Sequence, residues 1–89
     1  MEKRLGFVGI IVEDRAAAAP EVNQVLSEHA ELVVSRTGFP YPKRGCHVIT
    51  LIVDATTDEL GELTGRLGQL ASVSVKAALA KSGGTKTPG

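Results

Sequence analysis

The sequence of 89 residues has one cysteine, no tryptophan and no surplus of either charge. A single cysteine cannot form an internal disulfide, and the absence of a CxxC pair is typical of a reducing compartment, so we expect a cytoplasmic location. The ten basic and ten acidic residues cancel. Because a stand-alone DNA or RNA binder needs a basic surface, we expect no direct contact with nucleic acid.

Long apolar runs are also missing. The apolar stretch Leu5–Val12 is interrupted by glycine and followed by a charged turn, whereas a helix needs about 20 apolar residues to cross a bilayer. We therefore predict neither an export signal nor a membrane segment. The length suits one small domain, to which we assign residues 1–81. The tail 82–89 lacks apolar residues, which predicts disorder there.

Apolar periodicity predicts a strand, a helix, two strands, a second helix and a last strand. The expected ranges are, in order, Leu5–Val12, Ala17–Ala30, Leu32–Thr37, Cys46–Val53, Thr57–Leu70 behind a capping box at Thr56–Glu59, and Val73–Leu79. Pro20 is expected in the first turn of its helix, where a missing N–H costs least. Glycine and proline in 38–45 predict a loop between the second and third strands.

The two halves of the chain repeat the same pattern. A shift of 41 positions pairs apolar residues of one half with apolar residues of the other, as with Val8 and Ile49 or Leu26 and Leu67. Two βαβ units predict an α+β, ferredoxin-like β-α-β-β-α-β sandwich, which is a four-stranded antiparallel sheet with both helices on one face. The first and third strands are central in that fold, and they are the most apolar strands here.

Both faces of these central strands are apolar. In the first strand, Leu5, Phe7 and Ile11 alternate with Val8, Ile10 and Val12. Helices can cover only one face, and a solvated second face would alternate apolar with polar residues. We therefore expect a homodimer or homotetramer that buries the open face of the sheet.

Five segments together resemble a known family. They are VEDR (12–15), VNQVL (22–26), RTGFP (36–40), TDELGELTGRLGQL (57–70) and VSVKA (73–77). In combination they are similar to the small ACT-like regulators associated with iron-only hydrogenase systems, whose fold is similar to the C-terminal domain of the nickel-responsive repressor. The resemblance implies an oligomeric, ACT-like domain with a regulatory role in an anaerobic or hydrogen-metabolising bacterium. That repressor also carries a ribbon-helix-helix DNA reader. The segment before Leu5 could not form one, so we expect no direct DNA repression by this chain alone.

Glu13, Asp14 and Arg15 lie where the first strand meets the first helix. ACT domains, which the resemblance implies, commonly bind amino acids near this junction at a subunit interface, where helix N–H groups hold carboxylates. These residues are our ligand-binding candidates. The alternative is a charged cap in which Asp14 accepts backbone N–H bonds.

Cys46, His47 and His29 are the residues of types that bind transition metals. Neighbours in a strand point to opposite faces, so Cys46 and His47 should not converge on one ion within a subunit. His29 falls on the apolar helix stripe and is interpreted as a packing residue, although a site shared between subunits stays open. We predict no metal site, leave any cofactor unknown, and expect no enzyme, because no acid-base pair or triad can be identified.

Phe39 and Tyr41 are two of the three aromatic residues in the chain. They could stack a ligand ring beside Lys43 and Arg44, but scarce aromatics are usually recruited to packing, so we favour a subunit interface. Gly61 and Gly65 share one face of the second helix, where we expect close approach to the sheet, the other helix or another subunit.

These features predict a regulatory module that is not an enzyme and that forms homo-oligomers to sense a small-molecule effector or a metal. The alternative is an accessory or assembly protein that acts through protein contacts without a ligand. A hydrogenase-related protein is the partner that the resemblance implies.

Overall fold

The computed structural model describes residues 2–81, with Arg15 described by its backbone alone. The tail 82–89, for which the sequence predicts disorder, lies outside the described residues. The elements in chain order are β1 (Arg4–Val12), α1 (Arg15–Glu28), the 3-10 turn η1 (Ala30–Leu32), β2 (Val33–Tyr41), the 3-10 turn η2 (Pro42–Arg44), β3 (Cys46–Ala55), α2 (Thr57–Gly68) and β4 (Val73–Leu79).

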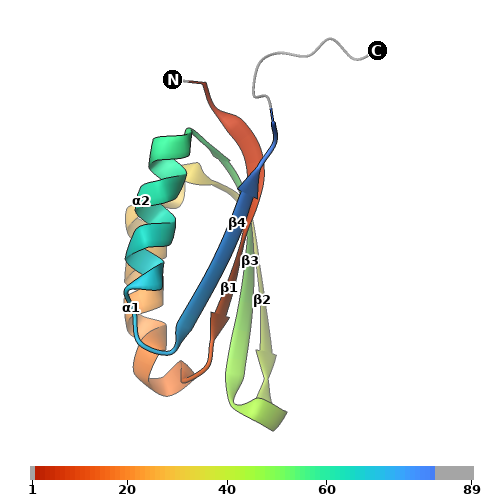
Figure 1. Ribbon diagram of the computed structural model, residues 1–89. Coiled ribbons are helices and arrows are strands. Elements are labelled where there is room, and N and C mark those ends of the chain that lie inside the picture. Colours follow the sequence, from red (N-terminus) through yellow and green to blue (C-terminus); the bar gives the residue numbers. More distant parts are fainter. Residues whose placement is uncertain (1, 82–89) are drawn as a thin grey trace.

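The strands form one sheet in the order β2-β3-β1-β4, and all neighbours are antiparallel. Both helices lie on the same face of this sheet, and the other face is bare (Figure 1). The predicted ferredoxin-like fold is therefore confirmed, with β1 and β3 in the centre. Gly9 pairs with Thr50, and these two positions are also related by the 41-residue shift. The internal repeat thus centres on this pair.

The core lies between the sheet and the helices. Alternate residues of the central strands point toward the helices and meet the apolar stripe of each helix. The most completely buried side chains are those of Val8, Ile10, Val12, Val22, Leu51, Val53, Leu63 and Leu67.

The ends of the helices are fixed by side chains. Asp14 caps α1 by accepting a hydrogen bond from the Ala17 N–H at 3.3 Å. Because this cap starts the helix at Arg15, Pro20 lies in the helix interior, so the prediction of a first-turn proline is wrong. The predicted capping box is confirmed at α2, where the Glu59 N–H donates to Thr56 Oγ1 at 3.1 Å. Within residues 2–81, neither helix is long and apolar enough to cross a membrane.

The second strand is longer than its sequence predicts. β2 continues to Tyr41 through Gly38 and Pro40, so the first half of the predicted loop is strand. Pro40 is tolerated because β2 is an edge strand, where half of the backbone N–H groups need no partner in the sheet. The reversal is made instead by η2 and by Gly45, whose φ of 63° suits glycine.

Two of the glycines of α2, Gly61 and Gly65, have no close neighbours. A Cβ added at Gly61 or Gly65 would meet nothing within 4 Å. Close approach to the sheet or to α1 is therefore wrong as an explanation of these residues. Contact with another subunit stays a prediction.

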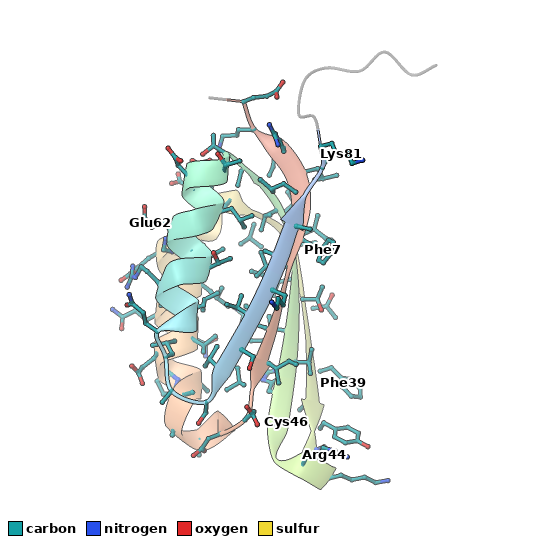
Figure 2. All side chains as sticks on the ribbon, in the orientation of Figure 1. Phe7, Phe39, Arg44, Cys46, Glu62 and Lys81 are labelled. Atoms are coloured by element: carbon teal, nitrogen blue, oxygen red, sulfur yellow. The ribbon has the colours of Figure 1, made fainter. Side chains whose placement is uncertain are left out.

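The bare face of the sheet is apolar at both ends. Leu5, Phe7 and Ile52 form one exposed group near the start of β1, and Ile11, Val48 and Phe39 line up across the sheet at the other end. Phe7 and Phe39 point away from the helices (Figure 2). The predicted second apolar face is therefore present, with Thr37, Thr50 and Lys76 in a polar row between its two halves.

Candidate functional site

The β1–α1 junction holds the three residues predicted to bind a ligand. The Glu13 N–H donates to the Ser72 carbonyl at 2.7 Å, and Asp14 is the N-cap of α1. The side chains of Glu13 and Asp14 are exposed, and Arg15 opens the helix. The capping role of Asp14 is therefore present in the fold, while ligand binding by these residues stays a prediction.

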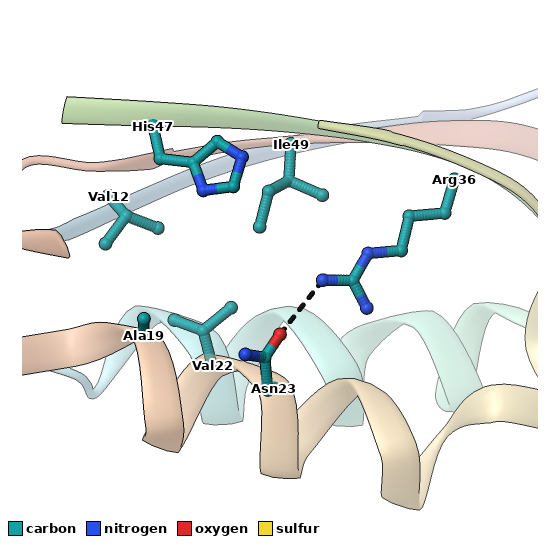
Figure 3. A pocket seen from close by; sticks show the side chains of 7 residues that line it. All are labelled: Val12, Ala19, Val22, Asn23, Arg36, His47 and Ile49. Carbon is teal, nitrogen blue, oxygen red and sulfur yellow. Dashed lines mark hydrogen bonds between the residues drawn. The ribbon is translucent and has the colours of Figure 1, made fainter. Parts of the chain in front are cut away.

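A hollow on the helix side of the sheet lies between α1 and the edge strand β2. It has a volume of about 120 Å³, and we call it the α1–β2 groove (Figure 3). Both of its sides carry apolar and polar side chains, with His47 between Val12 and Ile49 on the sheet and Asn23 beside Val22 on α1 (Figure 3). Its lining residues are Val12, Ala19, Val22, Asn23, Arg36, His47 and Ile49.

Arg36 crosses the mouth of this groove. Its Nη2 donates to the Asn23 Oδ1 at 2.9 Å, which ties β2 to α1. Among the side chains that the structure describes, no carboxylate forms an ion pair with Arg36. A guanidinium has several N–H donors, so the bond to Asn23 leaves donors for a second acceptor.

His47 enters the groove because Gly38 leaves room for it. His47 is on the same face of β3 as Ile49, and its ring points toward α1 (Figure 3). A Cβ at Gly38 would lie 2.9 Å from the His47 Nε2, closer than real Cβ contacts. The glycine in β2 therefore leaves the space that the imidazole occupies.

The hollow continues on the far side of Arg36. There a second depression of about 250 Å³ lies over Leu26, Val33 and Leu51, with Ser27 and Ala30 at its rim. Arg36 lines both spaces, and neither is lined by an acidic residue. The Arg36 guanidinium therefore supplies the positive charge of this region, and this charge favours the binding of an anion.

Sequence reasoning missed this convergence. Arg36 and His47 occupy strand positions whose side chains face the core, opposite Leu51 and beside Ile49 respectively. A polar residue in the apolar register of a strand is the signal that could have pointed to the groove. Pro40 pairs with His47, and this pairing places β2 beside the imidazole. The sequence does not predict the pairing, because the predicted second strand ends at Thr37.

The metal-binding residue types do not gather in one place. Cys46 and His47 alternate on β3, so only His47 faces α1, as predicted. His29 is 9% exposed, and its Nδ1 lies 2.8 Å from the Val25 carbonyl oxygen, so its interpretation as a packing residue is confirmed. In residues 2–81 no three metal-binding side chains cluster. A site shared between subunits stays a prediction.

The aromatic pair lies on the bare face of the sheet, near the η2 end of β2. The rings of Phe39 and Tyr41 are stacked with centroids 6.2 Å apart, and Phe39 is 61% exposed. Lys43 and Arg44 follow in η2. The pair is thus available for contact with a neighbour, and its role at an interface stays a prediction.

Comparison with protein families matches residues 4–77 to the family described as "TM1266-like: Iron-only hydrogenase system regulator, putative". A search of curated proteins found no match.

Solved structures show the same fold. The uncharacterized protein TM1266 from Thermotoga maritima is 36% identical, with a TM-score of 0.86 over 90% of this chain and 100% of that one. The ACT domain from GTP pyrophosphokinase of Chlorobium tepidum is 20% identical, with a TM-score of 0.72 over 85% and 99%. A formyltetrahydrofolate deformylase from Pseudomonas syringae is 14% identical, with a TM-score of 0.64 over 89% of this chain but 28% of the enzyme. The last two likenesses establish the fold alone.

Proposed function

Because the chain belongs to the TM1266-like family of iron-only hydrogenase system regulators, we propose that it is a non-enzymatic, homo-oligomeric module that senses a small molecule. It passes the change to another protein, for which a hydrogenase-related component is the first candidate. The lone cysteine is consistent with action in the cytoplasm.

The bare apolar face of the sheet is the observation that supports a homo-oligomer. Fully burying one large aliphatic or aromatic side chain gains about 1.5–3 kcal/mol. Leu5, Phe7 and Phe39 are each more than half exposed in the single chain. Covering this face with a second copy recovers that free energy, and two or four copies satisfy the same need.

The β1–α1 junction is the proposed ligand site. Glu13, Asp14 and Arg15 meet at the start of α1, where free N–H groups favour a carboxylate. An amino acid, whose ammonium and carboxylate groups match the two signs of charge in this segment, is the class to test first. Binding beside the subunit contact would couple the ligand to the assembly.

Native mass spectrometry of protein purified without chelators or a metal-affinity tag is the first test. An oligomer that carries extra mass after buffer exchange supports a sensor and identifies its metabolite or metal. A monomer at micromolar concentration refutes the assembly.

A thermal-shift panel of the amino acids tests the ligand site. We expect one of them to raise the melting temperature of the parent protein and to lose that effect when Asp14→Ala and Arg15→Ala are combined. No shift with any amino acid refutes the proposal for this site.

The accessory-protein alternative is favoured by one observation. Phe39 and Tyr41 are stacked and exposed beside the basic residues of η2, an arrangement of aromatic and basic side chains that protein interfaces use. If a hydrogenase component binds the parent protein without any ligand and fails to bind Phe39→Ser, the accessory function replaces the sensor.

A further inference from the structure

We propose that the α1–β2 groove binds a small aliphatic carboxylate, with Arg36 holding the carboxylate and the apolar side chains of the lining contacting the hydrocarbon. This inference shares with the proposed function only the premise of a small ligand. It concerns a different site, on the helix side of the sheet within one subunit.

The charge of the groove selects an anion. Arg36 is its cationic residue, and no lining residue is acidic. The bond from Arg36 to Asn23 Oδ1 holds the guanidinium at the mouth of the groove. A carboxylate can accept the remaining N–H groups in the two-pronged geometry that guanidinium groups favour.

Two other polar residues of the lining offer further hydrogen bonds. The Asn23 carboxamide nitrogen is a donor next to the guanidinium, and the imidazole of His47 carries a donor on at least one nitrogen. Among the described side chains, neither of these nitrogen groups has a hydrogen-bond partner. Gly38 leaves room for the imidazole, since a Cβ there would lie 2.9 Å from its Nε2.

The apolar residues of the lining select a hydrocarbon. Val12, Val22 and Ile49 line the groove and are at most 3% exposed, so almost none of their surface is in contact with water. The groove volume of about 120 Å³ is close to that of an engineered protein cavity of about 150 Å³ that binds benzene. A branched acid such as isobutyrate therefore has a suitable size.

The test is a methyl NMR titration of the full chain with sodium isobutyrate. We expect saturable shifts for the methyl groups of Val12, Val22 and Ile49, and none for Val8 or Leu63. Isobutyramide lacks the charge and should bind about tenfold more weakly. Acetate lacks two carbon groups and should also bind about tenfold more weakly.

Two matched variants locate the site. Arg36→Gln should weaken isobutyrate binding at least about tenfold, because a charge-assisted hydrogen bond is lost. Arg44→Gln removes the same charge from the exposed turn η2, outside the groove, and should leave binding unchanged. Backbone amide spectra show whether each variant keeps the parent fold.

The inference is overturned if isobutyrate gives no saturable shift, or if Arg36→Gln and Arg44→Gln bind it equally. It is also overturned if the shifts occur only around the β1–α1 junction. In each of these cases the assembly of the proposed function still stands or falls by native mass spectrometry, so the two failures are distinguishable.

Discussion

The substitution Phe7→Lys should separate the subunits without unfolding them. Phe7 lies on the bare face of the sheet and is 52% exposed in the single chain. Covering this exposed half recovers about 1 kcal/mol per copy, which is half of what full burial gains. A symmetric pair buries two copies, so about 2 kcal/mol of association free energy depends on this residue.

The dissociation constant should therefore rise at least about 30-fold. A lysine at the contact adds to this effect, because an ammonium group loses its hydration there. Within one chain the change is mild, since strand propensities span only about 1 kcal/mol. Sedimentation velocity over a range of protein concentrations measures the dissociation constant, and circular dichroism monitors the fold.

Ala71→Lys is the matched control. Ala71 is exposed in the turn between α2 and β4, near the helix C-terminus where a positive charge is favourable. We expect its assembly to equal that of the parent. If Phe7→Lys and Ala71→Lys associate equally well, the bare face is not the subunit contact and the burial argument is refuted.

Three further predictions concern stability. Gly6→Ala places a Cβ 2.3 Å from the Ala78 carbonyl oxygen and should destabilise by about 1–3 kcal/mol, whereas Gly65→Ala meets no atom and should stabilise by about 1 kcal/mol. If Gly6→Ala and Gly65→Ala changed the free energy of unfolding in urea equally, the close packing at Gly6 would be contradicted. Asp14→Ala removes the helix cap and should lower the free energy of unfolding by about 1 kcal/mol, and Asp14→Asn should lower it much less. If Asp14→Ala left the free energy of unfolding unchanged, Asp14 would not be the cap. A hydrogen bond from the Thr56 N–H is the main cause that lowers the pKa of the Glu59 carboxyl, and a hydrogen bond from Lys3 lowers it further. The ionised Glu59 carboxylate therefore stabilises the fold above the ordinary pKa of a glutamate, and this stabilisation is lost as the pH falls through the lowered value. Glu59→Gln should flatten this part of the pH profile of unfolding, and an unchanged profile would argue against it.

The sequence predicts the central elements well because their signals are local. β1 and β3 are apolar on both faces, which only a central strand requires, and the Thr56–Glu59 box marks the start of α2. The second half of β2 was missed because Gly38 and Pro40 are turn formers in most contexts. Only the place of β2 at the sheet edge makes them acceptable there.

The candidate sites were less predictable than the fold. The residues of the β1–α1 junction are consecutive, so one segment of sequence presents them together. Arg36, Asn23 and His47 come from three different elements. Their meeting depends on the register between β2 and β3 and on where α1 crosses the sheet, and a single sequence specifies neither.

The close approach of Gly38 to His47 has a counterpart at the other edge of the sheet, between β1 and β4. The 41-residue shift turns Gly38 into Leu79 and His47 into Gly6, and a Cβ at Gly6 would collide with the Leu79 side chain. Each of the two contacts thus joins one glycine of the first half to one large side chain of the second half, and the repeat exchanges the two roles. In a duplicated chain of this kind, one copy of a motif can acquire polar chemistry while the other copy only packs. The pseudo-symmetric position around Leu79 is therefore an internal control with which substitutions in the groove can be compared.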